Sequence, residues 1–191
     1  MSQKNEENVE FIMNSLTNEQ IISFISNDIV NILILYINCN KYIKEIKIII
    51  ENKENEKTDI INDNDPLYSN KIPKIKIEDY INRFFTYSKM EISTLLLTYI
   101  YIKRFIAKEK YIISFRNIFR LIMSCSILAI KFNENKIYKN SFYAKIGGFD
   151  VDDLNNLEYN IFSRLDFNLR VLDIEFYELI FKIYKECHDE G

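Results

Sequence analysis

The chain has 191 residues, of which 48% are hydrophobic and 14% aromatic, and it carries a formal net charge of −3. This length suits one domain with a substantial core, and the three glycines and two prolines favour long helices over turn-rich β structure. The three cysteines, Cys39, Cys125 and Cys187, show no C-x-x-C spacing, so neither a disulfide framework nor a zinc site is predicted.

Residues 1–50 are predicted to be an N-terminal helical extension, with two helices over 9–50. Thr17 and Gln20 have the spacing of a capping box at the start of the second helix. The apolar stretch 21–50 is interrupted by polar side chains too often for a membrane span, and the acidic N-terminus does not resemble a signal peptide. We therefore expect no membrane partner and a location in the nucleus or cytoplasm.

Residues 51–71 are polar and acidic and are predicted to be a linker, which makes the extension an addition to the main domain. A dense series of helices then follows. We expect helices over about 78–87, 91–107, 114–133 and 141–146, a fifth from residue 150, and a last one over 173–185 in a C-terminal segment, 171–191. No strand pattern competes with the helical periodicity, so the fold class is all-α.

The helix over 114–133 is predicted to be the central and most buried one. Its apolar face recurs every three or four residues, as an amphipathic helix requires, at Phe115, Ile118, Ile122, Cys125, Ala129 and Phe132. Its middle contains the small residues Ser124, Cys125, Ser126 and Ala129. Small side chains let neighbouring helix axes approach closely, so other helices should pack around this one.

Two sequence signals predict where the short helix ends and the fifth begins. Gly147 and Gly148 are two of only three glycines, and such a pair favours a helix stop. Asp150 can accept hydrogen bonds from the amides of the following first turn, and Asp152 and Asp153 lie favourably near the positive helix end. These carboxylates are therefore interpreted as caps or solvated charges.

The sequence carries no recognisable catalytic site. It has no Gly-rich phosphate loop, no H-E-x-x-H and no G-x-S-x-G, and its single histidine is His188. We expect a protein that is not an enzyme and that needs no cofactor and no metal.

Charge is distributed unevenly along the chain. Residues 1–70 have 6 Lys or Arg against 12 Asp or Glu, residues 71–147 have 15 against 5, and residues 148–191 have 4 against 11. The basic middle segment could bind nucleic acid, complement its own acidic flanks or meet an acidic partner. Its aromatic residues recur at core-like helical spacing, which argues against nucleic acid.

Lys131 and Glu158 both border apolar faces. From periodicity alone, Lys131 is best explained as a solvated lysine at a helix C-terminus and Glu158 as a flanking residue that reaches water. Together, a lysine and a glutamate beside an exposed apolar patch would suit the binding of backbone groups of a partner protein.

Several blocks of sequence resemble the cyclin box of the Pho80-like (P-type) cyclins over roughly residues 72–170. These blocks are Tyr80-Ile-Asn-Arg-Phe, Tyr99-Ile-Tyr-Ile-Lys-Arg-Phe105, Phe115-Arg-Asn-Ile-Phe-Arg-Leu, Ala129-Ile-Lys-Phe132, Asn140-x-x-Tyr-Ala-Lys-x-Gly-Gly148 and Leu154-Asn-x-Leu-Glu158. The resemblance implies a five-helix bundle around a buried third helix.

The resemblance also implies a non-catalytic subunit that binds a cyclin-dependent Ser/Thr protein kinase and holds its mobile αC helix in the active position. The family's kinase-facing lysine and glutamate match Lys131 and Glu158, which are expected to hydrogen-bond to each other and to the kinase backbone. The apolar positions around them match Leu128, Phe132, Phe162 and Phe167.

The chain departs from the family pattern in two places. Lys103 stands where many cyclins carry Asp, so no Asp-centred salt bridge is carried over and Arg83 is assigned no role. Tyr80 stands where many cell-cycle cyclins use a tryptophan to dock Arg-x-Leu substrates, which makes such docking doubtful.

Two alternatives to a kinase regulator stay open. In the first, the cyclin fold is an adaptor that binds nucleic acid or a transcription-related partner through the basic segment 71–147. In the second, the N-terminal helices mediate association of the chain with itself.

Overall fold

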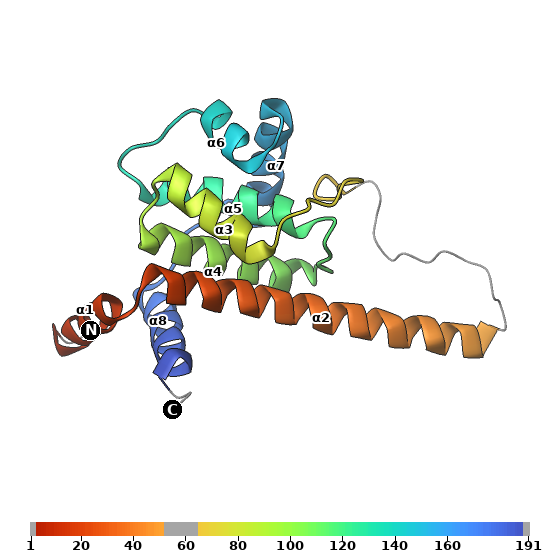
Figure 1. Ribbon diagram of the computed structural model, residues 1–191, viewed down its shortest axis with the longest axis horizontal. Helices are drawn as coiled ribbons and strands as arrows, with labels where there is room; N and C mark the ends of the chain where they lie inside the picture. Colours follow the sequence, from red (N-terminus) through yellow and green to blue (C-terminus); the bar gives the residue numbers. More distant parts are fainter. Residues whose placement is uncertain (1–2, 52–64, 189–191) are drawn as a thin grey trace.

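A computed structural model describes residues 3–51 and 65–188, and within these ranges the chain forms eight helices and no strand (Figure 1). The helices are α1 (Gln3–Ser15), α2 (Asn18–Glu51), α3 (Ile77–Ser88), α4 (Ile92–Glu109), α5 (Ile118–Asn133), α6 (Asn140–Gly147), α7 (Val151–Arg164) and α8 (Asp173–His188). The predicted all-α fold class is confirmed. Helices α3–α7 correspond to the five helices expected for the box.

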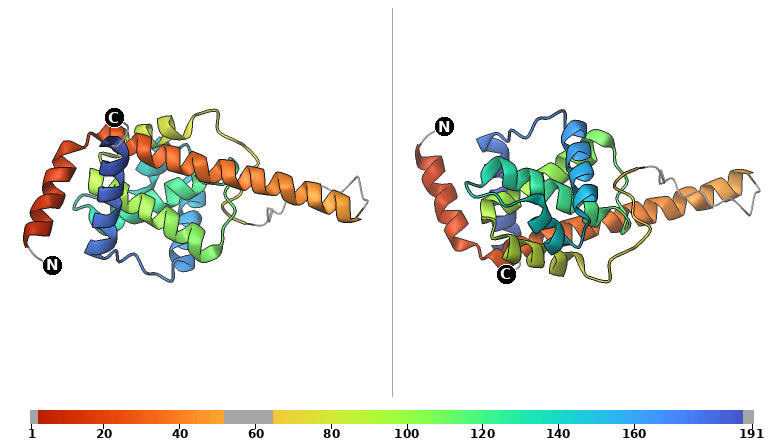
Figure 2. Two further views of the ribbon diagram at one scale, coloured as in Figure 1. Left: turned by 90° about the horizontal axis from the view of Figure 1, so that it is seen from below. Right: turned by 90° about the horizontal axis from the view of Figure 1, so that it is seen from above.

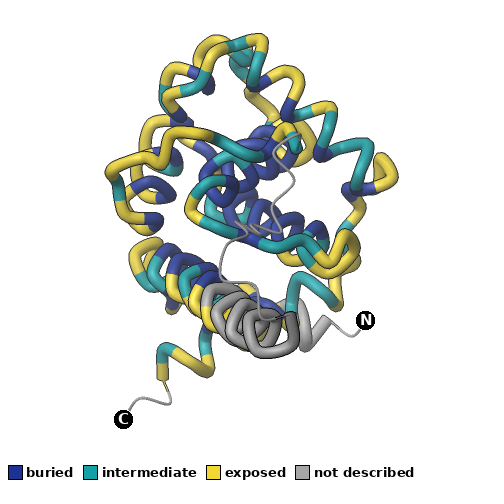
Figure 3. The backbone as a smooth tube through the Cα atoms, turned by 90° about the vertical axis from the view of Figure 1, so that its right-hand side faces the viewer, coloured by how far each residue is buried: buried dark blue, intermediate teal, exposed yellow. Residues whose placement is uncertain are grey.

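Helix α5 lies at the centre of the molecule, as its small residues predicted. Every residue from 121 to 130 is buried, and Figure 3 shows that the buried, dark blue stretches gather in the middle of the molecule. The Ser124 and Ser126 hydroxyls donate to main-chain carbonyls one turn earlier in the same helix, each at 2.8 Å. Their polar groups are thereby satisfied, so α5 can be buried on all sides without an unpaired hydroxyl.

The predicted start of this helix at Ser114 is wrong, because α5 begins at Ile118. The Asn117 side chain is buried, accepts from the Ser114 amide at 2.8 Å and donates to the Ile112 carbonyl at 3.0 Å. These bonds hold residues 114–117 as a turn outside the helix. Phe115 consequently lies 43% exposed and is not on the buried face.

The start of α2 confirms the capping box. The Gln20 amide donates to Thr17 Oγ1 at 3.1 Å, and the Thr17 amide donates to Gln20 Oε1 at 2.8 Å. The first half of α2 then packs on the rest of the molecule through an apolar stripe that is almost fully buried, namely Ile21, Ile25, Ile29 and Leu33. The second half extends beyond the body, whereas α1 lies beside α8 (Figure 2).

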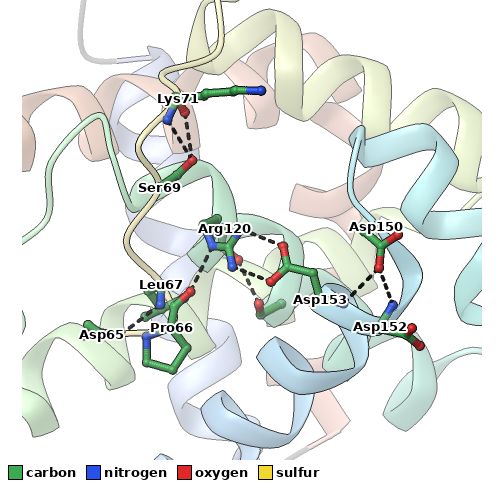
Figure 4. A network of polar contacts seen from close by, with 10 residues as sticks. Asp65, Pro66, Leu67, Ser69, Lys71, Arg120, Asp150, Asp152 and Asp153 are labelled. Carbon is green, nitrogen blue, oxygen red and sulfur yellow. Dashed lines mark hydrogen bonds and ion pairs between the residues drawn. The ribbon is translucent and has the colours of Figure 1, made fainter. Parts of the chain in front are cut away.

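The end of the predicted linker is part of the packed structure. Leu67 is fully buried, and the Pro66 carbonyl accepts from Arg120 Nε at 3.0 Å (Figure 4). Residues 52–64, most of the predicted linker 51–71, lie outside the described residues. The division at residues 50 and 71 therefore stays a prediction.

Membrane spans and metal sites were searched for in the part of the chain that the structure describes. Among residues 3–51 and 65–188, no helix is both long and apolar enough to span a bilayer. The same residues contain no group of three or more side chains that could hold a metal ion.

Candidate functional site: an ion pair beside exposed aromatic rings

Lys131 and Glu158 are brought together by the packing of α5 against α7. Lys131 lies in the last turn of α5, and its Nζ contacts both carboxylate oxygens of Glu158, at 2.6 and 2.7 Å. The expected hydrogen bond between the two side chains is present. The lysine side chain is 37% exposed and the glutamate side chain 17%, so the pair remains accessible from solvent.

Asn140 fixes the carboxylate from the other side. Its Nδ2 donates to Glu158 Oε2 and to Asn155 Oδ1, each at 2.7 Å. Glu158 thus accepts from an ammonium and an amide at once, which holds its rotamer in one orientation. Sequence reasoning gave Asn140 no role, although it begins the motif that ends at Gly148.

An aromatic patch lies beside the ion pair on α7 and the segment that follows it. The Phe162 and Phe167 rings meet edge to face with centroids 5.0 Å apart, and Tyr159 lies 6.5 Å from Phe167. Phe162 is partly buried, whereas Tyr159 is 66% and Phe167 57% exposed. We call Tyr159, Phe162 and Phe167 the aromatic patch.

The backbone at the end of α7 is strained. Asp166 and Phe167 both have φ of 55°, in the left-handed region that non-glycine residues rarely adopt. Each such residue costs on the order of 1 kcal/mol. The turn is held by Lys108, whose Nζ contacts the Arg164 carbonyl and Asp166 Oδ2, both at 2.6 Å. The Phe167 ring, carried by this turn, is exposed to solvent.

The other two predicted site residues, Phe132 and Leu128, differ in their exposure to solvent. Phe132 is 56% exposed next to Lys131, although its spacing on α5 also placed it on the buried face. Leu128 is only 3% exposed, because it is part of the core beneath the C-terminal half of α5. Leu128 therefore supports this surface from inside, and any contact of its own with a kinase stays a prediction.

Tyr159 could have been found from the sequence, since it follows Glu158 directly and lies outside the buried stripe of α7. That stripe is as predicted, because Leu154, Leu157, Ile161 and Leu165 are all buried. An aromatic residue off the stripe of an amphipathic helix is expected to be exposed.

At the acidic start of α7, the structure confirms the predicted role of Asp150 but gives Asp153 a further one. Asp150 is the predicted cap and accepts from the Asp152 and Asp153 amides at 2.9 and 3.4 Å. Asp153, however, is not merely a cap or a solvated charge. It forms a two-pronged ion pair with Arg120 of α5 at 2.6 and 2.7 Å (Figure 4).

The basic segment 71–147 is partly neutralised by its own flanks. Five of its cations pair with carboxylates outside the segment: Lys103 with Asp28, Arg104 with Glu175, Lys108 with Asp166, Arg120 with Asp153, and Lys131 with Glu158. Of the three explanations left open for the charge pattern, self-complementation thus accounts for a third of the 15 basic residues.

Known proteins resemble this chain over half of its length or somewhat more. Cyclin-U2-1 of Arabidopsis thaliana is 39% identical over 101 residues, which are 52% of this chain and 46% of that protein. Cyclin-U3-1 of the same plant is 32% identical over 117 residues, 61% and 53% of the two chains. Cyclin-P3-1 of Oryza sativa subsp. japonica is 31% identical over 108 residues, 56% and 45%. The chain spans about half the length of the curated relatives it matches.

A family model described as Cyclin matches residues 20–169. The match includes all of α3–α7 and nearly all of α2, so it covers well over half of the chain. Together with the U-type and P-type names of the relatives, it confirms the predicted family. The chain belongs to the cyclin family.

Proposed function

We propose that this chain is a regulatory subunit that binds a cyclin-dependent Ser/Thr protein kinase and activates it. Membership of the cyclin family supports a regulatory role of this kind. The single observation that carries the proposal is the accessible Lys131–Glu158 pair next to the exposed aromatic patch. The two charged side chains can hydrogen-bond to backbone groups at the end of a helix in another protein, and the aromatic rings beside them can pack against the apolar side chains of that helix.

Activation follows from the physics of a two-state kinase. The αC helix of a kinase must bring its glutamate to the lysine that holds the ATP phosphates, and it is mobile without support. A partner that contacts only the active position of this helix shifts the population toward it. In the proposed complex, Lys131 and Glu158 bind the backbone near the start of αC, while Phe132, Phe162 and Phe167 pack on its apolar side.

Binding and activity of purified cyclin-dependent kinases test this proposal. Lys131→Ala or Glu158→Ala should weaken kinase association by roughly thirtyfold or more, because either change leaves the other charge unpaired in the interface. Both variants should lose kinase activation in a phosphorylation assay. Their melting temperatures should stay close to that of the original chain, because the pair is partly exposed.

Lys103→Ala provides a matched control. Lys103 also forms a partly exposed ion pair, with Asp28 at 3.2 Å, but it joins α4 to α2 away from the proposed contact. This variant should bind and activate the kinase normally. Undiminished binding by both Lys131→Ala and Glu158→Ala would show that the kinase surface has been assigned wrongly.

A further inference from the structure

Helix α7 ends in a hydrogen-bonded turn over residues 164–167, which we call the α7 turn. The Phe167 amide donates to the Phe162 carbonyl at 2.9 Å, and the Asp166 amide donates to the Ser163 carbonyl at 3.0 Å. This pair of bonds is the Schellman motif, in which the side chain after the first left-handed residue commonly contacts the side chain of the first carbonyl. Here these side chains are Phe167 and Phe162, whose ring centroids lie 5.0 Å apart. The contact between these two rings of the aromatic patch therefore depends on how α7 ends.

The α7 turn is built from residues that do not favour its backbone conformation. Its first left-handed position is usually a glycine, but Asp166 stands there, and Phe167 follows with the same φ of 55°. Within the described ranges, the other non-glycine residues with positive φ are single helix caps, Lys89 and Lys110. Consecutive residues in this region persist only where surrounding contacts hold them. The α7 turn therefore needs contacts from a neighbouring element.

Helix α4 supplies such contacts along one of its faces. Three of its side chains each donate to a main-chain carbonyl of the segment 164–169: Tyr101 to Leu169 at 2.8 Å, Arg104 to Asn168 at 3.3 Å, and Lys108 to Arg164 at 2.6 Å. Positions 101, 104 and 108 share one side of the helix, because residues three or four apart are neighbours on its surface. The chain that leaves α7 is therefore bound through its backbone to one face of α4.

Lys108 is the side chain of this face that contacts the α7 turn itself. Its Nζ lies 2.6 Å from both the Arg164 carbonyl and Asp166 Oδ2. Arg164 is the last residue of α7, so the ammonium lies at the negative end of the helix, where a cation is favourable. The Asp166 carboxylate belongs to the first left-handed residue. Lys108 thus binds a carbonyl that the two Schellman bonds do not use, and it also binds the side chain of a strained residue.

The exposure of the α7 turn shows that burial alone does not hold it. The Phe167 residue is 57% exposed, and the Asp166 side chain is 77% exposed. A ring that remains more than half in water gains little free energy from burial, so it contributes little to fixing its own backbone. Costly backbone conformations are found most often at sites that bind a ligand or a partner. An exposed ring on such a backbone, beside the Lys131–Glu158 pair, fits this pattern.

We propose that Lys108 is a positioning residue for kinase binding, which holds the α7 turn so that the Phe167 ring is fixed before the partner arrives. This inference rests on the function proposed above, in which Phe167 packs on the αC helix. Lys108 touches no kinase group and acts through the backbone of Asp166 and Phe167. A ring that is already fixed loses less conformational freedom on association, and the affinity is higher for that reason.

Two measurements on the full chain test the proposal: titration calorimetry with a kinase that binds the original chain, and amide hydrogen exchange of the free chain. Lys108→Met keeps a long side chain and removes the ammonium. We expect kinase affinity to fall roughly tenfold, because the ring must be ordered on binding. The amides of Asp166 and Phe167 should exchange roughly tenfold faster or more, because the turn opens more often.

Lys103→Met is the matched control. It makes the same substitution on the same helix and removes an ion pair, that with Asp28 at 3.2 Å, which does not involve the α7 turn. This variant should bind the kinase like the original chain, and the exchange of the Asp166 and Phe167 amides should be unchanged.

Two substitutions of Asp166 separate positioning from stability. Asp166→Gly removes the Cβ that makes the left-handed conformation costly, and it also removes the carboxylate that Lys108 binds. Its melting temperature should stay close to the original, because the relief of strain offsets the loss of a partly exposed ion pair. Its kinase affinity should nevertheless fall several-fold, because the turn gains conformational freedom. Asp166→Asn tolerates the left-handed conformation and keeps an oxygen for the ammonium, so its affinity should stay within about twofold of the original.

Two outcomes would overturn the proposal. The first is unchanged exchange of the Asp166 and Phe167 amides in Lys108→Met, since the lysine would then not hold the turn. The second is normal kinase binding by Lys108→Met in an assay where Lys131→Ala and Phe167→Ala lose affinity. Normal binding by Lys131→Ala and Phe167→Ala would contradict the proposed kinase surface itself. The exchange rates are measured without a kinase, so the two failures are distinguishable.

Discussion

Glu158 is held by a neighbour, Asn140, to which the proposed complex assigns no kinase contact. Asn140→Ala removes the 2.7 Å hydrogen bond to Glu158 Oε2 and leaves Lys131 as its partner. We expect kinase affinity to fall roughly tenfold, because the carboxylate regains rotamer freedom. The free energy of unfolding should fall by only about 1 kcal/mol, the usual contribution of one hydrogen bond.

Asn155→Ala is the matched control for this positioning role. Asn155 accepts the other Asn140 hydrogen bond at 2.7 Å but makes no bond to Glu158. Its loss should leave kinase affinity, measured by titration calorimetry, close to the original value. If the two variants weaken kinase binding equally, Asn140 acts through the general stability of α6 and not through the carboxylate.

At the level of single residues, sequence reasoning predicted the Lys131–Glu158 pair but not what holds it. Both residues stand in motifs that could be matched to a family. Asn140, in contrast, lies eighteen residues from Glu158, and only the packing of α6 against α7 brings them together. Asp28 and Lys103 illustrate the same limit, because their 3.2 Å contact joins residues 75 apart. Long-range polar pairs leave no local pattern in a sequence.

The end of α6 offers a test at the level of one element. Gly148 has φ of 77°, a left-handed conformation that favours glycine, and its amide donates to the Ala144 carbonyl. An added Cβ would meet nothing within 4 Å. Gly148→Ala should therefore destabilise the chain by about 1 kcal/mol through the backbone alone. Gly148→Asn should cost less, because asparagine tolerates this conformation.

Chemical denaturation monitored by circular dichroism measures these differences. Ser141→Ala, an exposed change in the same helix, should be neutral. A Gly148→Ala chain as stable as the original would contradict the role of Gly148 as the left-handed cap of α6.

The ends of helices were predictable from the sequence where one local pattern dominated, and they were misplaced where apolar periodicity and a turn-forming residue favoured different positions. Glycines ended α6, and the Thr17–Gln20 box began α2, as expected. The start of α5 was misplaced because the periodic Phe115 outweighed the turn chemistry of Asn117. Asparagine binds nearby main-chain groups in turns, and here it makes two such bonds.

At the scale of the whole molecule, two ion pairs join α5 to α7, one near each end of α5. Arg120 binds Asp153 near the start of the two helices, and Lys131 binds Glu158 further along. The uneven distribution of charge along the sequence is therefore explained in part by ion pairs between packed helices. Ten of the 15 basic residues in the segment 71–147 have no ion pair among the described residues, and five of these ten line two hollows at the surface: Lys71, Lys74, Arg83, Arg116 and Lys145. Sequence counts showed the excess of positive charge but could not show where it remains.

The dense aromatic core predicts how the folded chain responds to alkali. Burial raises the pKa of Tyr80, Tyr99, Tyr101 and Tyr111 well above the ordinary value for tyrosine, and for Tyr99 a hydrogen bond to Asp28 adds to the effect. In the unfolded chain these phenols ionise near pH 10. Above that pH the unfolded chain has released protons that the folded chain retains, so stability falls as pH rises.

We therefore expect a melting temperature insensitive to these four groups below about pH 9 and a steep decline above pH 10. Phenolate absorbance at 295 nm should rise together with the loss of helical circular dichroism. Tyr101→Phe should lower stability at neutral pH, because the Leu169 carbonyl loses its 2.8 Å donor, and should make the alkaline decline shallower. Tyr159→Phe changes an exposed ring and should not alter that decline. Complete phenolate absorbance with intact helical signal would show that these rings ionise in the folded chain, which is incompatible with the buried core described here.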